Sequence, residues 1–168
     1  MPPPVTAAAA FGIGYRPMTD EDLPFVSALF ASTRAEEVAA TGWPPEMQRA
    51  FLEQQHRAQH QHYRQVNPEG EWLIVEQGGA PIGRLYLNES EGELHLIDIS
   101  LLPEARGAGL GGAIMADLMA DAAGRAKPIT LYVEKFNPAR RLYVRLGFEA
   151  VEDKGVHDRM RWHPGQGA

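Results

Sequence analysis

Leu101-Leu-Pro-Glu-Ala-Arg106-Gly-Ala-Gly109-Leu-Gly111-Gly112 is the stretch that decides the fold. An apolar run leads into it, and apolar residues at three- and four-residue spacing follow Gly109, as in an amphipathic helix. Because glycine has no Cβ, several backbone N–H groups can crowd around one anion. The start of a helix adds roughly half a positive charge, and Arg106 can add a charge-assisted contact. The pattern is typical of a pyrophosphate-binding turn.

Two other glycine-rich motifs fit this stretch less well. A P-loop ends in Gly-Lys-Ser/Thr, and the sequence has no such ending. A dinucleotide-binding fingerprint follows the first strand of a parallel unit. Here the turn follows an expected hairpin and has an arginine just before its glycines.

The rest of the chain predicts helices and strands that alternate only in part, which indicates a mixed α/β or α+β fold. Alternating or buried apolar runs bounded by turn residues predict strands over 11–16, 71–76, 81–87, 93–102, 129–133, 148–152 and 156–162. Helical spacing and end signals predict helices from residue 19, over 44–65, from residue 110 and over 138–146.

Composition bounds the class of protein. A length of 168 residues suits one domain over residues 11–165, after a Pro- and Ala-rich flexible tail over residues 1–10. A net charge of −6 argues against nucleic acid as the partner. The absence of cysteine excludes disulfides and thiolate chemistry. With no basic leader and no apolar run of membrane-spanning length, we expect a cytoplasmic protein without a membrane partner.

Two motifs together resemble a known family. Arg106-Gly-Ala-Gly109-Leu-Gly111 resembles the R/Q-x-x-G-x-G/A signature of the GNAT N-acetyltransferase superfamily. About thirty residues later, Asn137-Pro-Ala-Arg-Arg-Leu-Tyr143-Val-Arg-Leu-Gly147-Phe148 resembles the later helix of that family. The resemblance covers residues 70–162 well. It implies a central, twisted, mostly antiparallel sheet flanked by helices, which splays open in the middle around acetyl-coenzyme A.

The resemblance also implies the cofactor-binding residues. The backbone of Ile99 and Leu101 would pair with the pantetheine arm, and Asn137 would contact it from the side. Arg106 and Arg140 are candidates for the phosphates. The pyrophosphate would lie on the N–H groups of the turn, formed by Gly107, Ala108, Gly109, Leu110, Gly111 and Gly112.

One departure from the family pattern affects Asn137. Tyr143 follows Asn137 by six residues instead of the usual seven, and one residue rotates a helix by about 100°. Either the helix starts a residue later or Asn137 does not have its usual role.

The implied activity is N-acetyltransferase chemistry, in which an amine attacks the thioester directly in a ternary complex. Tyr143 is the candidate acid for the leaving thiolate. His95 is the candidate base because its ordinary pKa lies near 6.5, and Glu93 is the reserve. Strand alternation predicts Glu93 and His95 on one face of the sheet and Asp98 on the other. For Asp98 we expect a structural hydrogen-bonding role.

Several alternatives stay open. A non-catalytic acyl-coenzyme A sensor has the same motifs, and a longer acyl group or a hydroxyl acceptor fits the same site. The acceptor is a small amine or a protein amine, and homodimers are common among such relatives. His56 and His60 share a helical face that we interpret as solvated, with no metal site. Trp43, Phe51 and Tyr63 line an acceptor pocket or pack in the core.

Overall fold

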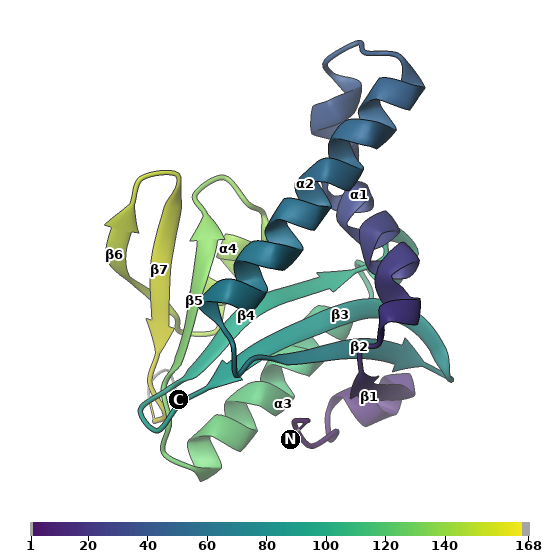
Figure 1. The fold of residues 1–168 in the computed structure, drawn as a ribbon. Helices are drawn as coiled ribbons and strands as arrows, with labels where there is room; N and C mark the ends of the chain where they lie inside the picture. The colour runs from purple at the N-terminus through teal and green to yellow at the C-terminus, as the bar shows by residue number, and fades with distance from the viewer. Residues whose placement is uncertain (1, 166–168) are drawn as a thin grey trace.

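The computed structural model describes residues 2–165 and contains a seven-stranded sheet in the order β1-β2-β3-β4-β5-β7-β6 (Figure 1). The strands are β1 (Ile13–Pro17), β2 (Glu71–Gln77), β3 (Ala80–Glu89), β4 (Leu94–Leu101), β5 (Ile129–Glu134), β6 (Glu149–Lys154) and β7 (His157–Trp162). Among the described strands only β4 and β5 pair in parallel. The predicted mixed α/β class with a mostly antiparallel open sheet is therefore confirmed.

The helices cover both faces of this sheet (Figure 1). The α-helices are α1 (Leu23–Ala39), α2 (Pro45–Val66), α3 (Leu110–Gly124) and α4 (Ala139–Arg145), and the 3₁₀ turns are η1 (Ala8–Phe11), η2 (Asp20–Asp22) and η3 (Pro103–Ala105). The helix expected from residue 19 begins as η2 and continues as α1. Most other ends fall within one or two residues of the sequence prediction.

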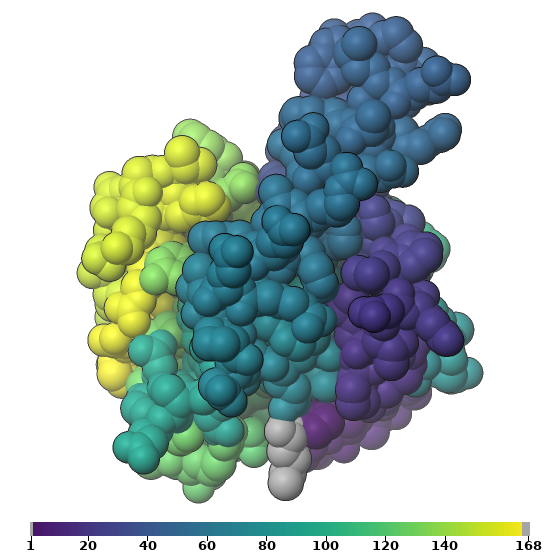
Figure 2. All heavy atoms as spheres, viewed as in Figure 1, coloured from purple at the N-terminus to yellow at the C-terminus, as the bar shows by residue number. Residues whose placement is uncertain are grey.

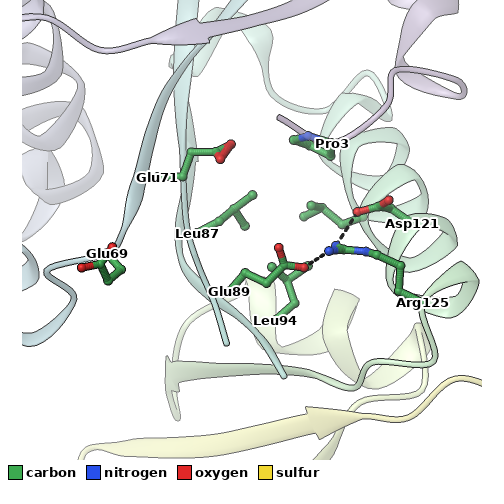
Figure 3. Close-up of a pocket in the computed structure, with 9 residues that line it drawn as sticks. Pro3, Glu69, Glu71, Leu87, Glu89, Leu94, Asp121 and Arg125 are labelled. Carbon is green, nitrogen blue, oxygen red and sulfur yellow. Dashed lines mark hydrogen bonds and ion pairs between the residues drawn. The ribbon is translucent and has the colours of Figure 1, made fainter. Parts of the chain in front are cut away.

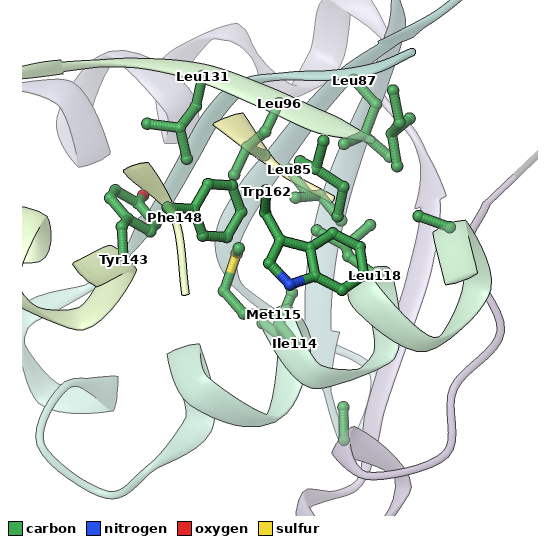
Figure 4. Packing of buried hydrophobic residues seen from close by; sticks show 14 of the residues in the cluster. Leu85, Leu87, Leu96, Ile114, Met115, Leu118, Leu131, Tyr143, Phe148 and Trp162 are labelled. Atoms are coloured by element: carbon green, nitrogen blue, oxygen red, sulfur yellow. The ribbon is translucent and has the colours of Figure 1, made fainter. Parts of the chain in front are cut away.

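The main hydrophobic core lies between the sheet and helix α3. Ile114, Met115 and Leu118 of α3 are fully buried against strand leucines such as Leu85 and Leu96 (Figure 4). Full burial of such side chains contributes about 1.5–3 kcal/mol each. This packing fixes α3, and with it the glycine-rich turn at its start, relative to β4.

On the opposite face, α1 and α2 form a hairpin that projects well beyond the sheet (Figures 1 and 2). Near its tip the Trp43 ring meets the Phe51 ring edge-on, with centroids 5.3 Å apart. Neither helix of the pair, nor any other helix within residues 2–165, is long and apolar enough to cross a membrane.

The N-terminal segment differs from the flexible tail predicted over residues 1–10. In the described part, the backbone N–H groups of Thr6, Ala7 and Ala8 donate to the carboxylate of Asp117 on α3, over 2.7–3.0 Å. Ala8 is fully buried. A buried carboxylate needs such partners, which composition alone does not reveal. Residue 1 lies outside the described residues, and the domain limits stay a prediction.

A β-bulge in β4 overturns one prediction about side-chain direction. Tyr86 pairs with Asp98 but Leu87 pairs with Leu96, so Ile97 is an extra residue on β4. An extra residue reverses the alternation beyond it. Asp98 therefore shares the α1–α2 face with His95, and the prediction that the two face opposite sides is wrong.

Candidate functional site

The sheet opens between its two central strands. β4 and β5 pair over only three positions, which end at Leu96 and Leu131. Beyond that point β4 continues to Leu101 and β5 to Glu134 without pairing to each other. A gap therefore runs from this last pair to the end of β4.

The backbone of β4 turns polar groups toward this gap. The Leu102 N–H donates to the Ile82 carbonyl over 2.8 Å, so residue 102 faces β3. Because direction alternates along an antiparallel strand, Ile99 and Leu101 face the other way, into the gap. These are the two residues whose backbone is expected, from the family resemblance, to pair with the pantetheine arm.

At the end of the gap lies the glycine-rich turn. Gly107 and Gly109 have φ values of +80° and +83°, which glycine adopts without strain. Within residues 2–165, none of the six backbone N–H groups from Gly107 to Gly112 donates to a backbone or side-chain acceptor. A Cβ at Gly111 or Gly112 would meet open space. The turn thus presents free donors at a helix start, which is anion-binding geometry.

Arg106 lies beside this turn but interacts with the protein itself. Its Nε donates to the Leu101 carbonyl over 2.9 Å, and its terminal nitrogen donates to the Ser32 hydroxyl over 3.3 Å. The side chain therefore ties the turn to the end of β4 and to α1.

Tyr143 on α4 is buried, and its ring lies 5.7 Å from that of Phe148 (Figure 4). It belongs to the same cluster as Leu96 and Leu131, the last pair before the strands separate. Burial, helped by the negative charge of Asp98, raises the pKa of Tyr143 to about 12. With this raised pKa the hydroxyl stays protonated at neutral pH, and it has no hydrogen-bond partner among the described residues.

His95 lies one residue before the gap opens. Its Nδ1 is 3.0 Å from the Thr130 hydroxyl, which in turn donates to Glu93. Burial lowers the pKa of His95, while the charge of Glu93 acts in the opposite direction. The lowered pKa favours the neutral form of His95 at physiological pH.

Comparison with known proteins identifies this arrangement. The family model described as "Acetyltransferase (GNAT) family" matches residues 31–148. The chain belongs to the GNAT acetyltransferase family. The gap, the turn and the two motifs predicted from the sequence are thus features of a GNAT protein.

Individual relatives agree with this assignment. The GNAT chain is 36% identical over 92 residues to a mycothiol acetyltransferase of Streptomyces bingchenggensis (strain BCW-1), which is 51% of this chain but only 29% of that protein. A PaiA N-acetyltransferase from Thermoplasma acidophilum in complex with coenzyme A has a TM-score of 0.65 at 17% identity, covering 90% of this chain and 98% of that one. An acetyltransferase from Thermus thermophilus has a TM-score of 0.64 at 19% identity, covering 90% and 96%. At these identities the solved structures show the fold alone.

Asn137 and Arg140 both have partners within the GNAT chain. The Asn137 side-chain oxygen accepts from the N–H of Ala139, the first residue of α4, over 2.9 Å. The helix begins at residue 139, one position later than predicted. Arg140 lies 3.2 Å from Asp158. Their roles toward a coenzyme stay predictions.

Sequence reasoning missed a buried charged network under α2. Arg84 is only 2% exposed and lies 2.9 Å from Asp98. Asp98 also accepts from the hydroxyls of Tyr63 and Ser100, over 3.1 and 2.6 Å, and Arg84 donates to Gln59 over 2.8 Å. The hydrogen-bonding role expected for Asp98 is confirmed. An arginine inside the apolar strand 81–87 was the signal that could have identified its partner.

The solvated face predicted for His56 is also corrected. His56 is buried, and its ring lies 5.6 Å from Phe30 of α1. Burial, with the nearby charges of Arg84 and His60, lowers its pKa to about 4. The long polar helix gave no sign that this side chain turns inward.

Cavities also lie outside the gap. One of about 430 Å³ lies between α1 and α2, and its lining residues are Phe30, Arg34, Glu37, Gln55, Ala58 and Gln59. Through Gln59 it adjoins the Arg84–Asp98 network. Another, of about 260 Å³, lies toward the end of α3, where Arg125 pairs with Glu89 and Asp121 (Figure 3). A helix of this length separates it from the turn by about 20 Å.

Proposed function

We propose that this GNAT protein is an N-acetyltransferase that moves an acetyl group from acetyl-coenzyme A to an amine by direct transfer in a ternary complex. The observation that carries the proposal is the continuous track formed by the gap and the turn. The backbone of Ile99 and the N–H of Leu101 face the gap, while the Leu101 carbonyl accepts from Arg106. Six free N–H groups follow at the end of the gap. An extended pantetheine arm attached to a pyrophosphate requires these two features in this order.

The two faces of the sheet supply the two proton-transfer groups. His95 faces the α1–α2 side at the closed end of the gap. A neutral His95 accepts a proton from the attacking amine, directly or through one water. Attack of the amine would form the N–C bond and move an electron pair onto the carbonyl oxygen, where an N–H group near Leu101 would stabilise it. Return of that pair would break the C–S bond and release the thiolate. Tyr143, on the α3–α4 side, gives its proton to the leaving thiolate.

The acceptor approaches from the face that contains the cavity between α1 and α2. Arg34 in that cavity is paired with Glu37 and Glu134, over 3.6 and 3.3 Å. The cavity lining therefore carries both positive and negative charge. These features accommodate a small amine or a protein amine. A cytoplasmic location and a homodimer stay predictions from the sequence.

The test is calorimetric titration with acetyl-coenzyme A, coenzyme A and ATP as a nucleotide control. We expect both coenzymes to bind in the micromolar range and ATP to bind far more weakly. Gly109→Asp places a carboxylate at the pyrophosphate position, and we expect it to abolish binding. Gly109→Asn is the matched control, because Asn also tolerates positive φ but adds no charge.

A screen for thiol release with an amine library then separates transfer from binding alone. Turnover with an amine supports the transferase. Tight coenzyme binding without turnover on any amine would instead support the acyl-coenzyme A sensor. If neither coenzyme binds, the proposal fails at its first step.

A further inference from the structure

Thr130 is fully buried between the two candidate base residues. Its backbone lies directly opposite His95 in the parallel pairing of β4 and β5. Its hydroxyl oxygen contacts both Oε2 of Glu93 and Nδ1 of His95, the latter over 3.0 Å. Arg159 of β7 lies 3.5 Å from the other oxygen of Glu93, Oε1, which leaves Oε2 for Thr130. The three side chains thus form a chain of hydrogen bonds beside the gap.

The hydroxyl has a single proton, and this determines the direction of both bonds. A carboxylate can only accept hydrogen bonds, so Thr130 donates its proton to Glu93. Its oxygen then has only lone pairs to offer His95. The bond between them therefore requires a proton on Nδ1 of His95, which leaves the lone pair of a neutral ring on Nε2.

Nε2 is the ring nitrogen that the amine substrate can reach. It has no hydrogen-bond partner among residues 2–165, and it is not among the buried polar atoms that lack one, so it has access to solvent. The His95 ring makes a T-shaped contact with the ring of Tyr132, with centroids 5.4 Å apart. His95 lies one position before β4 and β5 separate, on the α1–α2 face.

We propose that Glu93, Thr130 and His95 form a relay that fixes His95 in the Nδ1–H tautomer and so presents Nε2 as the base. The inference rests on the proposed function, since it specifies which nitrogen takes the proton of the amine. Thr130 acts through His95 and is a positioning residue. Glu93 is then the distal member of the relay, and His95 alone accepts the substrate proton.

Nitrogen-15 NMR of the histidine rings at neutral pH tests the tautomer directly, without any substrate. His95 is assigned by the loss of its signals in His95→Gln. We expect a protonated Nδ1 and an unprotonated Nε2 in the wild type and in Thr130→Ser, which keeps the hydroxyl. In Thr130→Val, which has the same shape without the hydroxyl, we expect loss of the preference for Nδ1–H. An Nε2–H tautomer in the wild type would overturn the relay.

Activity provides the second measurement. We expect Thr130→Val to lower kcat/KM by about tenfold or more, the scale seen when a partner that orients a metal-bound histidine is removed. Thr130→Ser should restore most of this loss. The matched control is Thr33→Val on α1, where the hydroxyl donates to the Phe30 carbonyl, and it should change neither the His95 tautomer nor kcat/KM. Unchanged kcat/KM in Thr130→Val would overturn the positioning role.

The two proposals fail in different ways. If the wild type shows no turnover with any amine, the transferase proposal fails while the NMR result still decides the relay. If turnover is found but His95 has the Nε2–H tautomer, the transferase stands and the relay is wrong.

Discussion

At the scale of a single residue, the hydroxyl of Tyr143 has no structural task within the described chain. Its ring packs on Phe148, and its hydroxyl has no partner among residues 2–165. Tyr143→Phe should therefore keep the fold and the affinity for acetyl-coenzyme A, while kcat falls about 100-fold or more because a general acid is lost. Calorimetry and thiol-release assays measure the two effects. Unchanged kcat would mean that another group protonates the thiolate.

The pH dependence of activity is also a single-residue property. Burial lowers the pKa of His95, and the negative charge of Glu93 partly opposes this, while Arg159 lowers it further. The base is active when neutral, so kcat/KM should rise with pH through a pKa below the ordinary 6.5. Glu93→Gln removes the opposing charge, so the acidic limb of the profile should move to lower pH.

The control for this profile is Glu91→Gln, which neutralises an exposed carboxylate two residues away. It should leave the acidic limb in place. A limb that is identical in the wild type and in Glu93→Gln would show that His95 is not the titrating base.

At the scale of an element, the glycines at the start of α3 lower the stability of the helix but leave its first N–H groups accessible. A Cβ at Gly111 meets open space, so Gly111→Ala should fold normally and gain up to about 0.5–1 kcal/mol of stability. The same methyl group would lie where an anion approaches the turn. We expect coenzyme affinity to fall about tenfold, or about 1.4 kcal/mol. Thermal unfolding and calorimetry measure both changes.

Gly124 at the other end of the same helix provides the matched control. A Cβ there also meets open space. Gly124→Ala should change stability in the same direction and leave coenzyme affinity unaltered. Equal affinity in both variants would contradict the assignment of the turn as the pyrophosphate site.

The N-terminal segment is attached to α3 through Asp117. Burial acts to raise the pKa of Asp117, but the N–H groups of Ala8, Ala7 and Thr6 outweigh it and lower the pKa overall. A carboxyl group with a lowered folded pKa contributes stability above its unfolded pKa, and this contribution is lost as pH falls through the folded value. Asp117→Ala should cost about 1–3 kcal/mol at pH 7. Urea unfolding of both proteins should show this difference shrink toward pH 3.

At the scale of the whole molecule, the sequence predicted what local chemistry determines. Pro103 ends β4 and Gly109 begins α3, because these residues act through their own backbone. Other features depend on contacts between segments that are far apart in the chain. They are the bulge at Ile97, the three N–H bonds to Asp117 and the inward direction of His56. No local pattern encodes them. The candidate residues could therefore be placed on strands that the structure contains, but the relative directions of His95 and Asp98 could not be predicted.

The ion pair between Arg84 and Asp98 joins the helical layer to the sheet, because Gln59 and Tyr63 of α2 bond to the two charged groups. Arg84→Leu leaves Asp98 without its counter-charge, and removing one partner of a buried pair typically costs about 3–5 kcal/mol. In Arg84→Leu with Asp98→Asn the uncompensated charge is gone, so the double variant should be more stable than Arg84→Leu alone. Urea unfolding measures all three proteins. As a control, Lys154→Met breaks a half-exposed pair with Glu152 and should cost less than about 1 kcal/mol. A double variant no more stable than Arg84→Leu would mean that packing of the arginine, and not its charge, joins α2 to the sheet.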